Sequence, residues 1–91
     1  METRLRDLIT EQLQRCARTE IAVETTFELF LKKRKNCIQA VETACKRLDN
    51  RRKYFILARD SNATSFIVNC KNQRYFIAIN PETYNVEVER A

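Results

Sequence analysis

The chain has 91 residues, of which 44% are hydrophobic and 32% charged, and its formal net charge is +5. This length predicts a single domain, residues 1–91, and no apolar run approaches the roughly 20 residues that cross a bilayer. The sequence contains no glycine and no histidine, which excludes glycine-rich phosphate loops and removes the commonest general base and metal ligand.

Residues 2–18 have the pattern of an amphipathic helix. Apolar residues recur at helical spacing along one side, namely Leu5, Leu8, Ile9, Leu13 and Cys16. Charged residues occupy the other side, as is typical of a helix at the surface of a globular protein. Because a helix of this length is marginal in water on its own, the leucine side must pack against another part of the protein.

Residues 26–49 predict a second helix, because apolar residues recur at intervals of three and four between Phe27 and Leu48. Thr25 and Glu28 have the spacing of a capping box, which begins a helix. Residues 20–31 also alternate between apolar and polar, so a strand is the alternative there. The polar run at 32–36 interrupts the apolar side, and a bend or break of the helix is the alternative to a continuous one.

After residue 50 the hydrophobic period changes from helical to alternating. This change predicts strands at about 53–59, 65–70, 73–79 and 84–89. The connections are short: Lys71 and Asn72 form a two-residue hairpin loop, and Pro81 stands second in a turn. Short links between consecutive strands predict an antiparallel meander. We therefore predict an α+β fold, with two N-terminal helices packed on a four-stranded antiparallel β-meander.

The first and third predicted strands are apolar on both sides. The third has Tyr75, Ile77 and Ile79 on one side and Phe76 and Ala78 on the other. A sheet with one face in water would instead alternate cleanly between apolar and polar residues. We therefore expect both faces of the sheet to be covered, the second by the first helix, by a partner or by a second copy in a homodimer.

The four cysteines, at positions 16, 37, 45 and 70, form no Cys-x-x-Cys pair. Without histidine they do not complete a familiar zinc site, so we expect no metal and no cofactor. We interpret them as small buried apolar residues, with an intersubunit disulfide or a reactive thiol as the alternative. The first residues lack the apolar core of a secretory signal, and we expect a cytoplasmic protein.

Nine cations lie within 22 residues, a density typical of surfaces that bind phosphates. They form two clusters, the first of Lys32, Lys33, Arg34 and Lys35 and the second of Lys46, Arg47, Arg51, Arg52 and Lys53. These are the candidate residues for binding a partner or nucleic acid. The alternative interpretation of both clusters is a solvated helix face.

Two similar segments, residues 52–57 and 73–78, place aromatic side chains next to cations. Such a composition occurs in stacking platforms for single-stranded nucleic acid, but tyrosine and phenylalanine are also ordinary core residues of strands. The sequence contains no catalytic signature. A nuclease-like activity without histidine would have to use residues such as Arg52, Arg74, Tyr75 and Glu87.

Together these patterns predict a small non-catalytic binding or regulatory protein. We expect it to act through protein–protein interaction, with another protein or with a second copy of itself as a homodimer. The alternative is a nucleic-acid-binding regulator that uses the two basic clusters. Neither interpretation involves a membrane.

Overall fold

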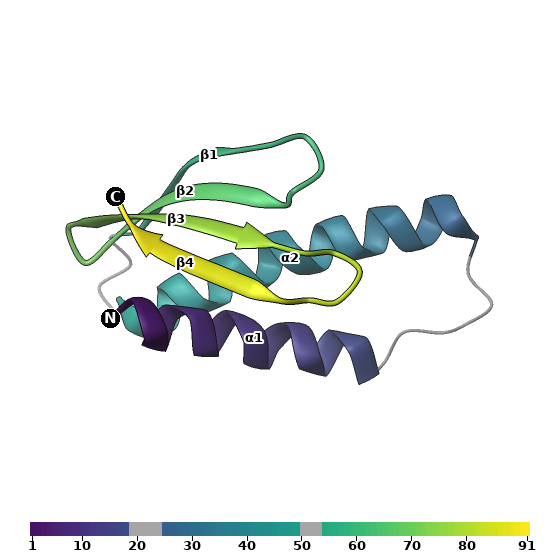
Figure 1. Ribbon diagram of the computed structural model, residues 1–91, viewed down its shortest axis with the longest axis horizontal. Helices are drawn as coiled ribbons and strands as arrows, with labels where there is room; N and C mark the ends of the chain where they lie inside the picture. Colours follow the sequence, from purple (N-terminus) through teal and green to yellow (C-terminus); the bar gives the residue numbers. More distant parts are fainter. Residues whose placement is uncertain (19–24, 50–53) are drawn as a thin grey trace.

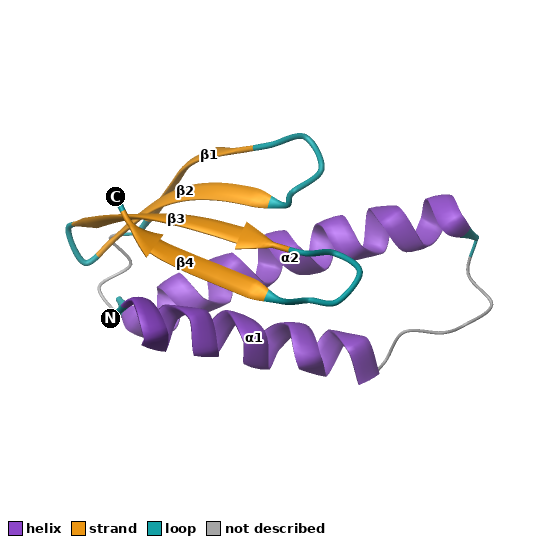
Figure 2. Ribbon diagram, in the orientation of Figure 1, coloured by secondary structure: helices purple, strands orange, loops and turns teal. Residues whose placement is uncertain are grey.

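The computed structural model describes residues 1–18, 25–49 and 54–91. The elements are helices α1 (Glu2–Arg18) and α2 (Thr26–Leu48), followed by strands β1 (Phe55–Arg59), β2 (Ser65–Cys70), β3 (Gln73–Ile79) and β4 (Val86–Arg90). The strands form one antiparallel sheet in the order β1-β2-β3-β4, and the two helices lie side by side against one of its faces (Figures 1 and 2). The predicted α+β fold class is confirmed.

Helix α1 packs as its sequence pattern predicts, with Leu5, Leu8, Ile9 and Leu13 buried. It lies along α2 and also packs on β4. At its start, Glu2 Oε1 lies 3.4 Å from Arg90 Nε, so that the first turn of the chain is paired with the last strand. The two-layer arrangement is therefore closed by contacts between the two ends of the chain.

Helix α2 begins with the predicted capping box. Glu28 N donates a hydrogen bond of 3.2 Å to Thr25 Oγ1, and Thr25 N donates one of 3.2 Å to Glu28 Oε2. The strand alternative for residues 20–31 is wrong for 26–31, because the cap satisfies backbone N–H groups that only a helix leaves unpaired. The rest of that alternative, residues 20–24, lies outside the described residues.

The helix continues through the polar run at 32–36, so the alternative of a break there is wrong. Two side chains of this run contact loops that connect the strands. Arg34 Nε donates a hydrogen bond of 2.8 Å to Ser61 O in the β1–β2 loop, and Lys33 Nζ lies 5.7 Å from the centre of the Tyr84 ring in the β3–β4 loop. These contacts hold the helix against both loops at one end of the sheet.

Only the C-terminal part of α2 supplies the core. Its buried residues are Cys37, Ala40, Val41, Ala44, Cys45 and Leu48. Phe27 and Leu31, which belong to the same predicted apolar side, are exposed. The reason is visible in Figure 1, where the N-terminal end of α2 extends beyond the end of the sheet. Of the two described helices, neither is both long and apolar enough to span a membrane.

The sheet turns one apolar side toward the helices. This inner face consists of Phe66, Val68, Cys70, Tyr75, Ile77, Ile79 and Val86, all of them buried. The β2–β3 turn has positive φ at Lys71 (51°) and Asn72 (62°), as the predicted two-residue loop requires. The last strand starts at Val86 and not at 84, because Tyr84 itself has a positive φ of 60° and belongs to the preceding turn.

Candidate protein-docking surface

The face of the sheet turned away from the helices, here called the outer face, follows directly from the strand register. At one level Ser65, Ala78 and Glu87 are neighbours; at the next, Ala58, Ile67, Phe76 and Glu89; at the third, Phe55, Asn69 and Arg74. Both helices pack on the opposite face. Of the three alternatives for the second face, cover by the first helix is therefore wrong, and this face lacks cover from α1 and α2.

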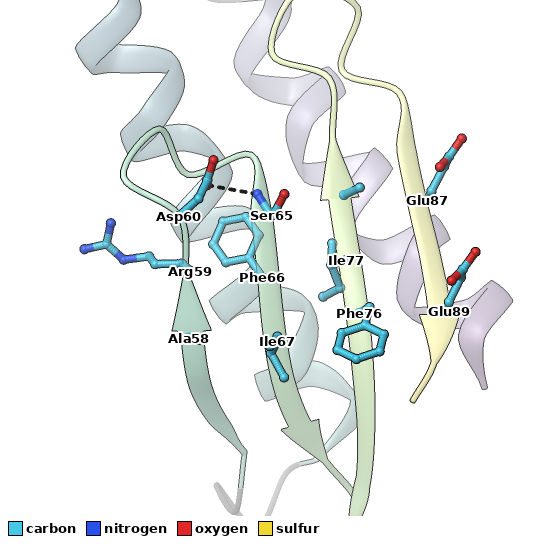
Figure 3. A pocket seen from close by; sticks show the side chains of 11 residues that line it. Ala58, Arg59, Asp60, Ser65, Phe66, Ile67, Phe76, Ile77, Glu87 and Glu89 are labelled. Atoms are coloured by element: carbon cyan, nitrogen blue, oxygen red, sulfur yellow. Dashed lines mark hydrogen bonds between the residues drawn. The ribbon is translucent and has the colours of Figure 1, made fainter.

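The centre of the outer face is apolar and open. Phe55 is 60% exposed and Phe76 is 46% exposed, although both lie within strands. Beside Phe76, the side chains of Ala58, Ile67 and Ala78 line a groove of about 380 Å³ (Figure 3). The apolar side chains in the middle of the outer face thus meet no other element of the described chain. Similar apolar side chains on the inner face are buried and form the core.

The two edges of the sheet differ in charge. Glu87 and Glu89 lie on the outer face at the β4 edge, whereas Arg59 at the β1 edge is the register partner of the inner-face residue Phe66 and extends sideways from the sheet (Figure 3). All three side chains belong to exposed residues. The outer face therefore has an acidic edge on β4 beside an apolar middle, and Arg74 on β3 adds an exposed cation at the level of Phe55 and Asn69.

One end of the groove is fixed by Asp60. Its carboxylate accepts hydrogen bonds from Thr64 N at 2.7 Å, Thr64 Oγ1 at 2.6 Å and Ser65 N at 3.0 Å. The bond from the Thr64 hydroxyl, together with those from the backbone N–H groups, lowers the pKa of this carboxyl below its ordinary value. Because Arg34 also binds the carbonyl of Ser61, the β1–β2 loop is held from both the sheet and α2.

The structure separates the predicted basic residues. Lys33 and Arg34 contact the sheet loops, and Arg47 Nη1 lies 3.9 Å from Glu11 Oε1 on α1. Lys35 and Lys46 are exposed, about 16 Å apart along the axis of α2. Lys32 is partly buried. The remaining predicted residues, Arg51, Arg52 and Lys53, lie outside the described residues.

The exposed side of α2 also carries an acidic residue. Helical spacing puts Glu42 on the same side as Lys35 and Lys46 and between them, and Glu42 is exposed. The described cations therefore form no uninterrupted basic stripe along the helix. Nucleic-acid binding by the two basic clusters stays a prediction from the sequence.

The residues considered for a nuclease-like activity do not converge. Tyr75 is buried on the inner face, while Arg74 and Glu87 lie on the outer face. Arg52 lies outside the described residues. Among the described residues, no three side chains of the metal-binding types gather into a group that would hold a metal ion.

Three of the cysteines are core residues, as interpreted from the sequence. Cys37, Cys45 and Cys70 are buried, and Cys16 is partly buried. Burial raises the pKa of Cys45 to about 12 and that of Cys37 to about 11. Cys70 Sγ lies 3.7 Å from the carbonyl oxygen of Cys45, so that these two cysteines bring β2 and α2 into contact. These thiols are poor nucleophiles at neutral pH.

A second group of exposed apolar side chains lies far from the outer face. It consists of Phe27, Phe30 and Leu31, on the end of α2 that extends beyond the sheet. This end of the helix adjoins residues 19–24, which lie outside the described residues. These exposed apolar residues are distant from the outer face, so a change at Phe27 is a suitable control for a change at Phe76.

Sequence reasoning missed Ile67 as a surface residue of interest. A signal for Ile67 exists, since Phe66, Ile67 and Val68 are three consecutive apolar residues in a strand, which puts one of them on the second face. Comparison with protein-family models, with curated proteins and with solved structures finds no match to this chain.

Proposed function

We propose that this protein is a non-catalytic binding module that acts through protein–protein interaction, and that the outer face of its sheet is the docking surface. The observation that supports the proposal is the apolar centre around Phe76, Ile67 and Ala58, which neither helix covers. Contiguous apolar surface of this kind on a small protein usually marks a site of interaction.

The distribution of residue types also favours a protein partner. Protein interfaces typically have an apolar, aromatic-rich centre and a charged rim that stays in contact with water. Phe76 lies on the third of four strands, and Phe55 lies on the first, while Glu87 and Glu89 lie at the β4 edge. A buried aromatic anchor near the middle is the usual source of most of the binding energy.

The surface is also built on paired strands and hydrogen-bonded loops of the chain itself. Its central side chains project from paired strands, and Asp60 and Arg34 hold the adjoining loop through the hydrogen bonds described above. A preformed surface reduces the entropy lost on association. Such a face suits recognition of a folded partner, whereas catalysis would need converging reactive groups, and Tyr75 is separated from Arg74 and Glu87 by the sheet itself.

The experiment that tests this proposal is site-specific photo-crosslinking in the native host. A benzophenone amino acid replaces Phe76 in one variant and Phe27, which is 68% exposed on α2, in the matched control. We expect position 76 to yield discrete protein adducts that position 27 does not yield. If position 76 gives no adduct, the same adducts as position 27, or adducts that disappear with nuclease treatment, the proposal is wrong.

A further inference from the structure

We propose that the edge of β4 that faces away from β3, here called the open edge, is a second docking site. It takes an extended segment of a partner protein with lysine or arginine at alternate positions, and this segment pairs with β4 as a fifth strand. The open edge is distinct from the outer face, so the inference goes beyond the proposed function and does not depend on it. It follows from the hydrogen bonding of β4, from the groove beside it and from the charges along it.

Two backbone hydrogen bonds show which residues of β4 are directed toward β3. Asn80 N donates one of 2.9 Å to Asn85 O. Ala91 N donates one of 3.0 Å to Arg74 O. Because bonded and non-bonded pairs alternate along an antiparallel ladder, and the register between β3 and β4 is regular, the odd-numbered residues of β4 bond to β3. The even-numbered residues therefore direct their N–H and C=O groups to the open edge, namely Val86, Val88 and Arg90.

Within the described part of the chain, no segment pairs with the open edge. β4 is the last strand in the order of the sheet, and none of the backbone hydrogen bonds made by loops, turns and caps reaches Val86, Val88 or Arg90. At the opposite edge of the sheet, a bulge between Ile56 and Ala58 interrupts the register of β1, and such a bulge hinders the pairing of a further strand. The regular ladder available for strand addition is therefore that of β4.

A groove of about 450 Å³ lies along the open edge. Four consecutive residues of β4, from Val86 to Glu89, line one wall, and Glu2, Thr3 and Arg6 of α1 line the other. Side chains of successive strand residues point to opposite faces, so a groove that touches four in a row runs along the backbone and not over one face. The groove thus leaves space beside β4 for one more strand, which lies about 4.8 Å from its neighbour.

The charges along the open edge select the segment that binds. Glu87 and Glu89 lie on the outer-face side of β4, and both are exposed. Neither carboxylate forms an ion pair with another described residue, whereas Arg90 is already paired with Glu2 at 3.4 Å. Side chains on the same face of neighbouring strands lie about 5 Å apart, so a strand with cations at alternate positions brings them next to these carboxylates. Anionic nucleic acid is disfavoured at this edge for the same reason.

The same two carboxylates disfavour a second copy of the chain as the added strand. Antiparallel pairing of β4 with its own copy around Val88 places Glu87 of each copy opposite Glu89 of the other. The next registers that the hydrogen bonding permits are shifted by two residues, and they place Glu87 opposite Glu87 or Glu89 opposite Glu89. Like charges directly opposite one another destabilise a ladder, so the strand that binds has to carry the opposite charge.

Amide hydrogen exchange of the full chain, followed by two-dimensional NMR, tests the inference. In the free protein the amides of Val86 and Val88 should exchange at least about tenfold faster than those of Glu87 and Glu89, which bond to β3. The probe is a capped peptide of about eight residues in which lysine alternates with valine. It should bind with a sub-millimolar Kd and slow the exchange of the even-numbered amides about tenfold, with little change at the odd-numbered ones.

Two further peptides and two variants separate strand addition from attraction by charge alone. A peptide with glutamate in place of lysine should not bind the wild type, and a lysine peptide methylated at every backbone nitrogen should not bind either, because it has no N–H donors. The variant Glu87→Lys with Glu89→Lys should bind the lysine peptide about tenfold more weakly and should now bind the glutamate peptide. The control Glu42→Lys changes an exposed glutamate on α2 and should leave the Kd unchanged. Circular dichroism of each variant confirms that it is folded.

Several results would overturn the inference. One is slow exchange at Val86 and Val88 in the free protein, which would mean that the edge is already paired. Others are no binding of the lysine peptide at about 1 mM, or equal binding of the methylated peptide. Protection of the even-numbered amides that rises with protein concentration, without peptide, would identify a second copy as the added strand. Crosslinking at position 76 tests the outer face separately, so either proposal can fail while the other stands.

Discussion

Two buried thiols make the folded protein sensitive to alkaline pH. Burial, with a smaller contribution from a neighbouring cysteine in each case, raises the pKa of Cys37 to about 11 and that of Cys45 to about 12, from an ordinary value of 9.0. The native thiols thus bind their protons more tightly than the unfolded chain does. Their contribution to stability is complete below pH 9, and it is lost as the pH rises from there toward the folded pKa values.

The size of the effect follows from these values. Above pH 9, each thiol removes about 1.4 kcal/mol from the free energy of unfolding for each pH unit, until its folded pKa is reached. At pH 10 the two together therefore cost about 3 kcal/mol relative to pH 8. Burial also raises the pKa of Cys70, which acts in the same direction. A loss of this size is a large fraction of the stability of a small domain.

Urea unfolding followed by far-ultraviolet circular dichroism, in reducing buffer between pH 7.5 and pH 10, measures the effect. The variant Cys37→Ala with Cys45→Ala should be less stable than the wild type at pH 7.5, because buried sulfur atoms are lost, but its stability should fall less steeply with pH. The control Val41→Ala changes a buried residue that does not titrate, and its slope should match that of the wild type. Equal slopes for the wild type and the double cysteine variant would refute the reasoning.

Three further predictions concern the free energy of unfolding measured with urea. Thr25→Ala removes the hydroxyl that caps α2 and should cost about 1 kcal/mol, whereas Thr25→Ser should cost little; equal losses in both would argue against the cap. Lys71→Gly should stabilise the protein by about 1 kcal/mol, because glycine adopts the positive φ of this turn without steric cost; a destabilised variant would contradict this. Phe66→Ala on the inner face should cost about 3–5 kcal/mol, and Phe76→Ala on the outer face about 1 kcal/mol or less. Similar losses at the two positions would mean that the outer face is covered within the monomer.

The elements themselves were predictable because their signals are local. Helical spacing, the capping box at Thr25 and Glu28, and the short turns between strands each depend on residues close together in sequence. The turn at Tyr84 was not predictable, because a bulky aromatic residue rarely adopts positive φ. There the ring is buried and packs next to Lys33, so tertiary contacts outweigh the local preference.

The candidate site was only partly predictable. The sequence shows that β3 is apolar on both sides, but it does not show which side the helices cover, because Ile77 and Phe76 are equally apolar. That choice depends on how the helix pair meets the sheet in three dimensions. The sequence also does not distinguish a cation that binds a partner from one that contacts its own chain, as Arg34 does with Ser61. Both distinctions require the packing of distant segments.

The contact between α1 and β4 has a consequence for the order of folding. The helix pair and the meander each form from segments adjacent in sequence, so each can assemble rapidly. The packing of α1 on β4, with Glu2 next to Arg90, instead joins the two ends of the chain. Closing so long a loop is entropically costly until most other contacts exist. We therefore expect the two ends to come together after the transition state, so that this contact governs how slowly the protein unfolds and has little effect on how fast it folds.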